Sequence, residues 1–170
     1  LFYNNMNGDI KKKISSTYHQ FFKRGLSGIT ASTRVLPNFI IVGTVRSGTT
    51  SLYYNICEHP SIISAAYDEI GFFDSNYHLG MNWYRSMFAT EKKMNSIKKE
   101  TGYAITGEDT PFYFWKKEVV ERIFKVLPDV KIIAIFRNPV DRAYSNYNLG
   151  LRAKTEKLTF ENSIDEEITF

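Results

Sequence analysis

A glycine-rich turn is the first feature of the chain whose residue types and spacing could do chemistry. Residues 39–52 read FIIVGTVRSGTTSL, so a short apolar run ends at Gly43 and a second glycine, Gly48, follows. The hydroxyl residues after it are Thr49, Thr50 and Ser51. A strand, a tight turn and a helix start direct backbone N–H groups and the positive end of a helix dipole toward one spot. The pattern predicts a site for a phosphate-like anion.

The glycine spacing matches the first half of a Walker A loop, but the second half departs from it. A Walker A loop has lysine after its second glycine, where it reaches the β- and γ-phosphates of a nucleotide. Here Thr49 occupies that position, and the cation inside the loop is Arg46, at the apex. This departure argues against an ordinary nucleoside triphosphatase. A plain strand-to-helix turn without a ligand is the simplest alternative interpretation.

A second candidate anion site lies at residues 136–147, which read FRNPVDRAYSNY. Arg137 follows an apolar run, and Ser145 lies about two helical turns further along. A guanidinium offers forked donors to a phosphate, and a nearby hydroxyl could add another hydrogen bond. The alternative is that Arg137 only pairs with Asp141 at the start of a helix, while Ser145 is an exposed helix residue.

The elements that would position these residues alternate along the chain. Strands are expected at residues 38–42, 62–63, 104–107 and 131–136, and helices at 50–58, 80–99 (one or two), 116–126, 139–149 and 160–168. Such alternation predicts an α/β fold with a P-loop-like parallel β-sheet flanked by helices. The apolar run at 131–136 shows no polar alternation, so this strand is expected to be buried on both faces.

Three polar segments follow the ends of expected strands, at residues 43–51, 108–111 and 137–141. Ligands of open α/β sheets bind beyond the carboxyl ends of the strands. We therefore expect these three segments to converge on one site.

Length and composition set further bounds. With 170 residues we expect one α/β domain at 37–170, preceded by an arm or linker at 1–36 that could include a short helix near 15–22. The net charge of +4 is too small to imply nucleic acid. Cys57 is the only cysteine, so no intrachain disulfide is possible, and it is expected to pack as a small apolar residue. No run is long enough to span a membrane.

The two anion motifs together resemble those of the sulfotransferases that use 3'-phosphoadenosine 5'-phosphosulfate. That resemblance covers residues 38–168. It implies that the 5'-phosphosulfate is bound by Arg46, Ser47, Gly48, Thr49, Thr50 and Ser51. It also implies that Arg137 and Ser145 bind the 3'-phosphate, that adenosine 3',5'-bisphosphate is the product, and that no metal is required. Because members of the family continue beyond the last expected helix, the domain is expected to be incomplete at its C-terminus.

Residues 68–74, DEIGFFD, are similar to a motif of the heparan sulfate type within this family. The resemblance implies that Glu69 is the catalytic base and that Arg46 stabilises the transferred group. Residues 107–114 look like another motif of that group, but Asp109 stands where lysine is usual. Trp83 and Tyr84 could form an acceptor wall, although core packing is the more ordinary role for such rings.

The implied reaction moves a sulfuryl group to a hydroxyl or amine of an acceptor, expected to be a carbohydrate. The rival interpretations are a P-loop kinase or hydrolase that uses ATP and Mg²⁺, and a catalytically inactive nucleotide-binding module. Against the kinase, lysine is missing after Gly48 and no acidic residue is predicted to end a strand as a magnesium anchor. His78 is expected to be a surface histidine. The oligomeric state stays open, and the compartment would be cytoplasmic in a prokaryote or the Golgi lumen if an anchor preceded Leu1.

Overall fold

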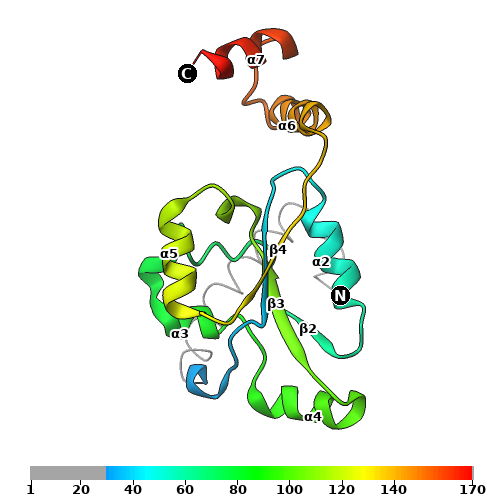
Figure 1. Cartoon of the computed structure of the whole chain (residues 1–170), viewed down its shortest axis with the longest axis vertical. Coiled ribbons are helices and arrows are strands. Elements are labelled where there is room, and N and C mark those ends of the chain that lie inside the picture. The colour runs from blue at the N-terminus through cyan, green and yellow to red at the C-terminus, as the bar shows by residue number, and fades with distance from the viewer. Residues whose placement is uncertain (1–29, 170) are drawn as a thin grey trace, which may run out of the picture.

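A parallel four-stranded sheet forms the centre of the molecule, as the computed structural model of residues 30–169 shows (Figure 1). The strands follow the order β2-β3-β1-β4, so the strand that leads into the glycine turn is central. Their bounds are Phe39–Gly43 for β1, Ile62–Ser64 for β2, Ile105–Asp109 for β3 and Lys131–Ala134 for β4. The α/β class with a parallel sheet flanked by helices is therefore confirmed. The helix expected near residues 15–22 and most of the expected arm lie outside the described residues.

The described residues also form helices, of which those before β4 lie on both faces of the sheet (Figure 1). The helices are α2 (Thr49–Cys57), α3 (Gly80–Arg85), α4 (Glu91–Thr101), α5 (Lys117–Val126), α6 (Pro139–Ala153) and α7 (Phe160–Ile168), with short 3-10 turns η2 (Ala31–Thr33), η3 (Tyr77–Leu79) and η4 (Pro111–Tyr113). The sequence predicted each of the helices, and the 80–99 segment forms two. The largest boundary difference is at α6, which continues to Ala153. β3 and α4 end two residues later than expected, and β4 ends two residues earlier, at Ala134.

The central strand β1 is buried on both faces because its side chains alternate between two apolar clusters. Phe39, Ile41 and the α2 residue Tyr53 form the cluster on the α2 face. Ile40 and Val42 join the larger cluster on the opposite face, which contains Phe72, Phe73, Tyr84, Met87, Phe88, Tyr113, Val119 and Ile123. Burial of this apolar surface is the main driving force that holds the helices on the sheet. The two clusters thereby fix the β1–α2 turn at the end of a rigid strand.

Strand β4 is an edge strand, so the prediction that residues 131–136 are buried on both faces is wrong. Among the described residues, β4 pairs only with β1. Ile132 is 52% exposed and Phe136 is 66% exposed, whereas Ile133 is half-buried against the α2-face cluster. The apolar run therefore reflects one covered face and one face that no described element covers.

The last two helices lie beyond the carboxyl ends of the strands, apart from the sheet (Figure 1). Asn138 caps α6, because its side-chain oxygen accepts hydrogen bonds from the amides of Val140 and Asp141 at 3.0 and 3.4 Å. Helix α7 packs on α6 through Phe160, whose ring centroid lies 5.2 Å from that of Tyr144. This arrangement places α6 above the β1–α2 turn.

Candidate active site

The β1–α2 loop, residues 43–49, has the backbone of an anion-binding turn. Gly48 adopts φ +92° at the N-cap of α2 and has no side chain with which to cap the helix. By contrast, the side chain of Thr90 caps α4. The first N–H groups of a helix have no intrahelical partner, so those of α2 are available to a ligand.

Glycine is also required where the loop begins. A Cβ atom on Gly43 would lie 2.8 Å from the Cβ of Phe114 and 2.9 Å from the carbonyl oxygen of Pro111. Any side chain at this position would therefore push η4 and the following residues away from the loop. The close approach brings the segment after β3 against the anion-binding turn, as the sequence predicted for the strand ends.

Internal contacts hold the loop in place. The Oγ1 of Thr44 and the Oγ of Ser47 lie 2.6 Å apart, and the amide of Thr44 donates to the carbonyl oxygen of Ile135 at 2.8 Å. Arg46 adopts φ +67°, a left-handed conformation that costs energy for a residue other than glycine. Residues held in such conformations cluster at ligand-binding sites, and here the turn places the cation at its apex.

The two predicted anion segments meet in space. The Nε of Arg46 donates a hydrogen bond to the Oγ of Ser145 at 3.1 Å, and the Nη1 of Arg137 donates to the carbonyl oxygen of Arg46 at 3.4 Å. Arg137 therefore lies on the same side of the sheet as the glycine turn. Among residues 30–169 the ion pair that forms is Lys116–Asp74, so the alternative pairing of Arg137 with the first turn of α6 is not observed.

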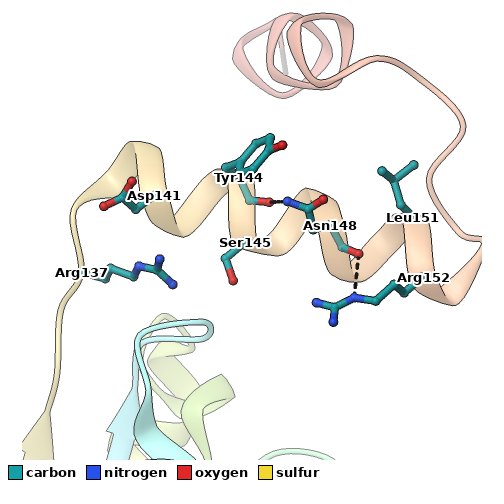
Figure 2. A pocket seen from close by; sticks show the side chains of 7 residues that line it. All are labelled: Arg137, Asp141, Tyr144, Ser145, Asn148, Leu151 and Arg152. Carbon is teal, nitrogen blue, oxygen red and sulfur yellow. Dashed lines mark hydrogen bonds between the residues drawn. The ribbon is translucent and has the colours of Figure 1, made fainter.

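A cavity of about 620 Å³ opens beside these residues (Figure 2). Its lining residues are Arg137, Asp141, Tyr144, Ser145, Asn148, Leu151 and Arg152. Figure 2 shows the side chains of Arg137, Ser145 and Arg152 on the side of α6 that faces the β1–α2 loop. Sequence reasoning missed Arg152, although its position about two helical turns after Ser145 could have placed it on the same face.

Glu69 lies beside the end of β3. Its amide donates to the carbonyl oxygen of Asp109 at 2.9 Å, its side chain is exposed, and its φ of +49° is again left-handed. Asp109 pairs in register with Ile41 of β1, two residues before Gly43. The segment that carries the predicted base is therefore a neighbour of the anion-binding turn. Asp68 next to it accepts a hydrogen bond from the hydroxyl of Tyr54.

Two buried acids end β3, which corrects the prediction that no acidic residue ends a strand. Glu108 is fully buried and accepts hydrogen bonds from Tyr84 at 2.5 Å and Thr110 at 2.9 Å. Burial raises the pKa of Glu108 to about 7. Burial, together with the negative charges of Asp68 and Glu69, raises the pKa of Asp109 to about 6. The sequence placed the strand end at residue 107, two residues too early, so these side chains were assigned to a loop.

The remaining residues that the sequence analysis considered lie in the core or at the surface. Tyr84 is fully buried and stacks on Phe72 with ring centroids 4.3 Å apart, so it belongs to the core rather than to an acceptor wall. Trp83 is half-buried against the same cluster, and His78 is exposed. Cys57 is half-buried against the α2-face cluster, as expected for a small apolar residue.

A parallel α/β sheet with a glycine turn after its central strand, and a second arginine-bearing segment in contact with that turn, is the architecture of a P-loop-like protein. The chain belongs to the sulfotransferase family: the model of the sulfotransferase domain matches residues 36–169.

Individual relatives agree with this assignment. Over 138 residues the chain is 37% identical to the membrane-associated sulfotransferase kil1 of Dictyostelium discoideum. The matched region covers 78% of this chain and 28% of that protein. It is 39% identical over 124 residues to human heparan sulfate glucosamine 3-O-sulfotransferase 5, covering 72% of this chain and 33% of the relative. It is 37% identical over 118 residues to the mouse bifunctional heparan sulfate N-deacetylase/N-sulfotransferase 4, covering 66% and 13%.

A solved structure shares the fold. The sulfotransferase from Alicyclobacillus acidocaldarius superimposes with a TM-score of 0.60 at 32% sequence identity, covering 79% of this chain and 58% of the other. The chain thus spans a third or less of the curated relatives named above. Proteins of this family generally use 3'-phosphoadenosine 5'-phosphosulfate as donor. Within residues 30–169 no helix is long and apolar enough to cross a membrane.

Proposed function

We propose that this protein transfers a sulfuryl group from 3'-phosphoadenosine 5'-phosphosulfate to a hydroxyl or amine of a carbohydrate acceptor. The observation that carries the proposal is the 3.1 Å contact between Arg46 and Ser145, because it joins an anion-binding turn to a second cationic site. A donor with a 5'-phosphosulfate and a 3'-phosphate needs two such sites at the separation of one nucleoside.

The β1–α2 loop is the proposed 5'-phosphosulfate site. The N–H groups at the start of α2 and the hydroxyls of Thr49, Thr50 and Ser51 would hold the 5'-phosphate, with Ser47 and Gly48 shaping the turn. Arg46 at the apex would stabilise charge on the transferred group and on the departing phosphate. Arginine keeps its proton under all physiological conditions, so Arg46 would act as a fixed charge rather than as a proton donor.

The cavity under α6 is the proposed 3'-phosphate site. Arg137 and Ser145 line it, and Arg152 adds a second guanidinium to the same space. Guanidinium groups bind phosphate through paired, charge-assisted hydrogen bonds. This assignment gives Arg137 and Ser145 the task of distinguishing the donor from nucleotides that lack a 3'-phosphate.

Glu69 is the proposed general base. In this scheme its carboxylate accepts the proton of the acceptor group as that oxygen or nitrogen forms a bond to sulfur. The bond between sulfur and the 5'-phosphate oxygen breaks, and adenosine 3',5'-bisphosphate leaves with the electron pair. Positioning and charge stabilisation dominate such group transfers, so no metal is invoked. Support comes from the position of Glu69 next to the strand that borders the anion-binding turn.

A calorimetric titration with adenosine 3',5'-bisphosphate, compared with ADP and with ATP plus Mg²⁺, tests the proposal. We expect the bisphosphate to bind at least about tenfold more tightly than ADP, since charge-assisted hydrogen bonds to the 3'-phosphate contribute about 1.5–3 kcal/mol. The carboxylate of Asp109 at the end of β3 is the one observation that favours the kinase alternative. Preferential binding of ATP with Mg²⁺ would support that alternative and refute the sulfotransferase proposal.

A further inference from the structure

The loop of residues 68–76, which we call the Glu69 loop, takes hydrogen-bond acceptors from the end of β3 and the residues that follow it. The amide of Glu69 donates to the carbonyl oxygen of Asp109 at 2.9 Å. Two residues further along the loop, the amide of Gly71 donates to the Oγ1 of Thr110 at 3.3 Å. The first of these bonds needs only the backbone, whereas the second needs a hydroxyl side chain. The side chain of Thr110 therefore holds the loop two residues from Glu69.

The backbone of the Glu69 loop needs such support because it is strained at Glu69. Glu69 adopts φ +49°, and Gly71 adopts φ +61°. A left-handed conformation costs energy for glutamate but not for glycine, and it persists only where neighbouring contacts over-determine it. Further along the loop, the amide of Phe73 donates to the hydroxyl oxygen of Tyr113 at 3.1 Å. The hydroxyls of Thr110 and Tyr113 therefore help to hold Glu69 in a conformation that it would not prefer by itself.

Thr110 also contacts the strand that leads into the β1–α2 loop. Its amide donates to the carbonyl oxygen of Ile41 at 3.0 Å, two residues before Gly43. The main chain and the side chain of one residue thus join the strand before the proposed donor site to the Glu69 loop. The next residue is Pro111, whose carbonyl oxygen would lie 2.9 Å from a Cβ atom on Gly43. This junction is therefore in close contact with the donor loop on one side and holds the Glu69 loop on the other.

Buried neighbours fix the direction of the Thr110 hydroxyl. Thr110 is buried, and its Oγ1 donates to the Oε2 of Glu108 at 2.9 Å. The other carboxylate oxygen of Glu108 accepts from the hydroxyl of Tyr84 at 2.5 Å. Because the hydroxyl proton of Thr110 is directed to Glu108, the lone pairs of its oxygen remain for the amide of Gly71. Buried and fully satisfied networks of this kind rigidify the residues that they join.

We propose that Thr110 is a positioning residue for sulfuryl transfer: its hydroxyl, supported by that of Tyr113, holds Glu69 in place relative to the β1–α2 loop. This inference rests on the proposed function, in which Glu69 accepts the proton of the acceptor group. Thr110 touches neither donor nor acceptor in this scheme and acts through the amide of Gly71. A general base must lie within hydrogen-bond reach of the group that it deprotonates, and a misplacement of about 1 Å can cost about a hundredfold in rate. Loss of the hydroxyl should therefore slow turnover without weakening donor binding.

The test measures sulfate transfer from labelled donor to N-desulfated heparan sulfate by Thr110→Val, which keeps the shape of the side chain but removes its hydroxyl. We expect kcat to fall about tenfold to a hundredfold, because the base is no longer held in place. The dissociation constant of adenosine 3',5'-bisphosphate, measured calorimetrically, should stay within about twofold. Thr110→Ser keeps the hydroxyl, so its kcat should stay within about threefold of the parent value.

Thr106 supplies the matched control on the same strand. Thr106 is also buried, and its Oγ1 donates to the carbonyl oxygen of Ile63 in β2 at 2.6 Å. Thr106→Val therefore removes a buried hydroxyl and its hydrogen bond without touching the Glu69 loop, and it should leave kcat unchanged. An unchanged kcat in Thr110→Val, or an equal loss of kcat in Thr106→Val, would overturn the proposal.

Combining the change with Glu69→Gln separates positioning from a general loss of structure. If Thr110 acts through Glu69, Thr110→Val should lower the residual rate of Glu69→Gln by less than about twofold, because residues that act as a unit have non-additive effects. Equal fold losses in the two backgrounds would overturn the proposal. If Thr110→Val does not fold, Tyr113→Phe should lower kcat about threefold to tenfold with unchanged bisphosphate affinity, and a normal kcat would then refute the inference.

Failure of the parent chain to bind the bisphosphate or to transfer sulfate would instead contradict the proposed function. Hydrogen exchange at the amides of Glu69 and Gly71 then decides whether Thr110 holds the loop. Exchange at least about tenfold faster in Thr110→Val than in the parent supports this role, and unchanged exchange overturns it.

Discussion

The Nε of Arg46 lies 3.1 Å from the Oγ of Ser145, across 99 positions of sequence. Arg46 belongs to the turn after the central strand, and Ser145 belongs to the helix that follows the edge strand. The contact forms because β1 and β4 are parallel neighbours, so both following segments begin at the same end of the sheet. It brings residues of the two proposed anion sites into direct contact.

Selection of the 3'-phosphate should depend on Arg137. Arg137→Ala should weaken binding of adenosine 3',5'-bisphosphate by about tenfold to a hundredfold, because it removes a charge-assisted hydrogen bond donor from the cavity. Binding of AMP should change by less than about twofold, since AMP has no group for that site. Calorimetric titrations of both ligands measure the difference. Arg137→Lys keeps the positive charge but loses the paired guanidinium donors, so its affinity for the bisphosphate should lie between those of the parent protein and Arg137→Ala. Equal weakening for AMP and the bisphosphate would refute the assignment.

The contact between Arg46 and Ser145 should be energetically coupled to ligand binding. Ser145→Ala should weaken bisphosphate binding about threefold to tenfold in the parent protein. In an Arg46→Ala background the same change should cost less, because the two side chains share a partner and their effects are not independent. A double-mutant cycle of dissociation constants measures the coupling. Strictly additive effects would show that the contact plays no part in binding the donor.

Glu69 should affect turnover without affecting donor binding. Glu69→Gln keeps the size and shape of the side chain but removes the base, so sulfate transfer should fall by about a hundredfold or more. The dissociation constant of adenosine 3',5'-bisphosphate should stay within about twofold, because the proposed role of Glu69 is to contact the acceptor and not the nucleotide. Transfer to N-desulfated heparan sulfate, followed with labelled donor, provides the rate. The exposed Glu121 provides a matched control: Glu121→Gln should have no effect, and normal turnover in the Glu69 variant would exclude it as the base.

The sequence predicted the order of elements and the meeting of the anion segments because those depend on local patterns. Apolar runs, glycine spacing and helical periodicity involve residues that are close together in the sequence. The parallel topology then brings the carboxyl ends of the strands together. Arg46, Arg137 and Ser145 could therefore be grouped from the sequence alone. The contact between Arg46 and Ser145 could not be predicted, since it depends on where α6 lies above the loop.

What the sequence did not reveal depends on sheet order and on exact strand ends. An apolar run such as residues 131–136 reads the same in a central strand and in an edge strand, and only the order β2-β3-β1-β4 separates them. In the same way, Glu108 and Asp109 disfavour a strand by propensity, so the predicted strand ended before them. Tertiary contacts hold both residues in β3, because Tyr84 and Thr110 satisfy Glu108 inside the core.

The edge position of β4 leads to a contrast between two neighbouring isoleucines. Ile133→Ala should lower the free energy of unfolding by about 1–3 kcal/mol, because its side chain packs on the α2-face cluster. Ile132→Ala should change it by less than about 0.5 kcal/mol in this chain, because that side chain is largely exposed. Urea titrations of the 170-residue chain measure both values. A strand buried on both faces would instead give two similar, large losses.

The buried carboxyl of Glu108 should make stability depend on pH near neutrality. Burial raises its pKa in the folded state from 4.5 to about 7, so between these values the folded protein holds a proton that the unfolded chain has lost. The contribution is therefore fully present below pH 4.5 and is lost as the pH rises through 7. The loss from this group is at most about 3–4 kcal/mol, since one unit of pKa corresponds to about 1.4 kcal/mol.

Glu108→Gln separates this contribution from those of other acids. The amide cannot ionise but still accepts a hydrogen bond from the hydroxyl of Tyr84, so the variant should lose less stability than the parent between pH 5 and 8. Asp109, with its raised pKa, adds a slope of the same sign, so Asp109→Asn should flatten the profile further when combined with the first change. Urea unfolding at a series of pH values measures these slopes. A parent slope that survives in Glu108→Gln would mean that the carboxyl is already ionised and stabilised by its hydrogen bonds to Tyr84 and Thr110, which lower its pKa against the effect of burial.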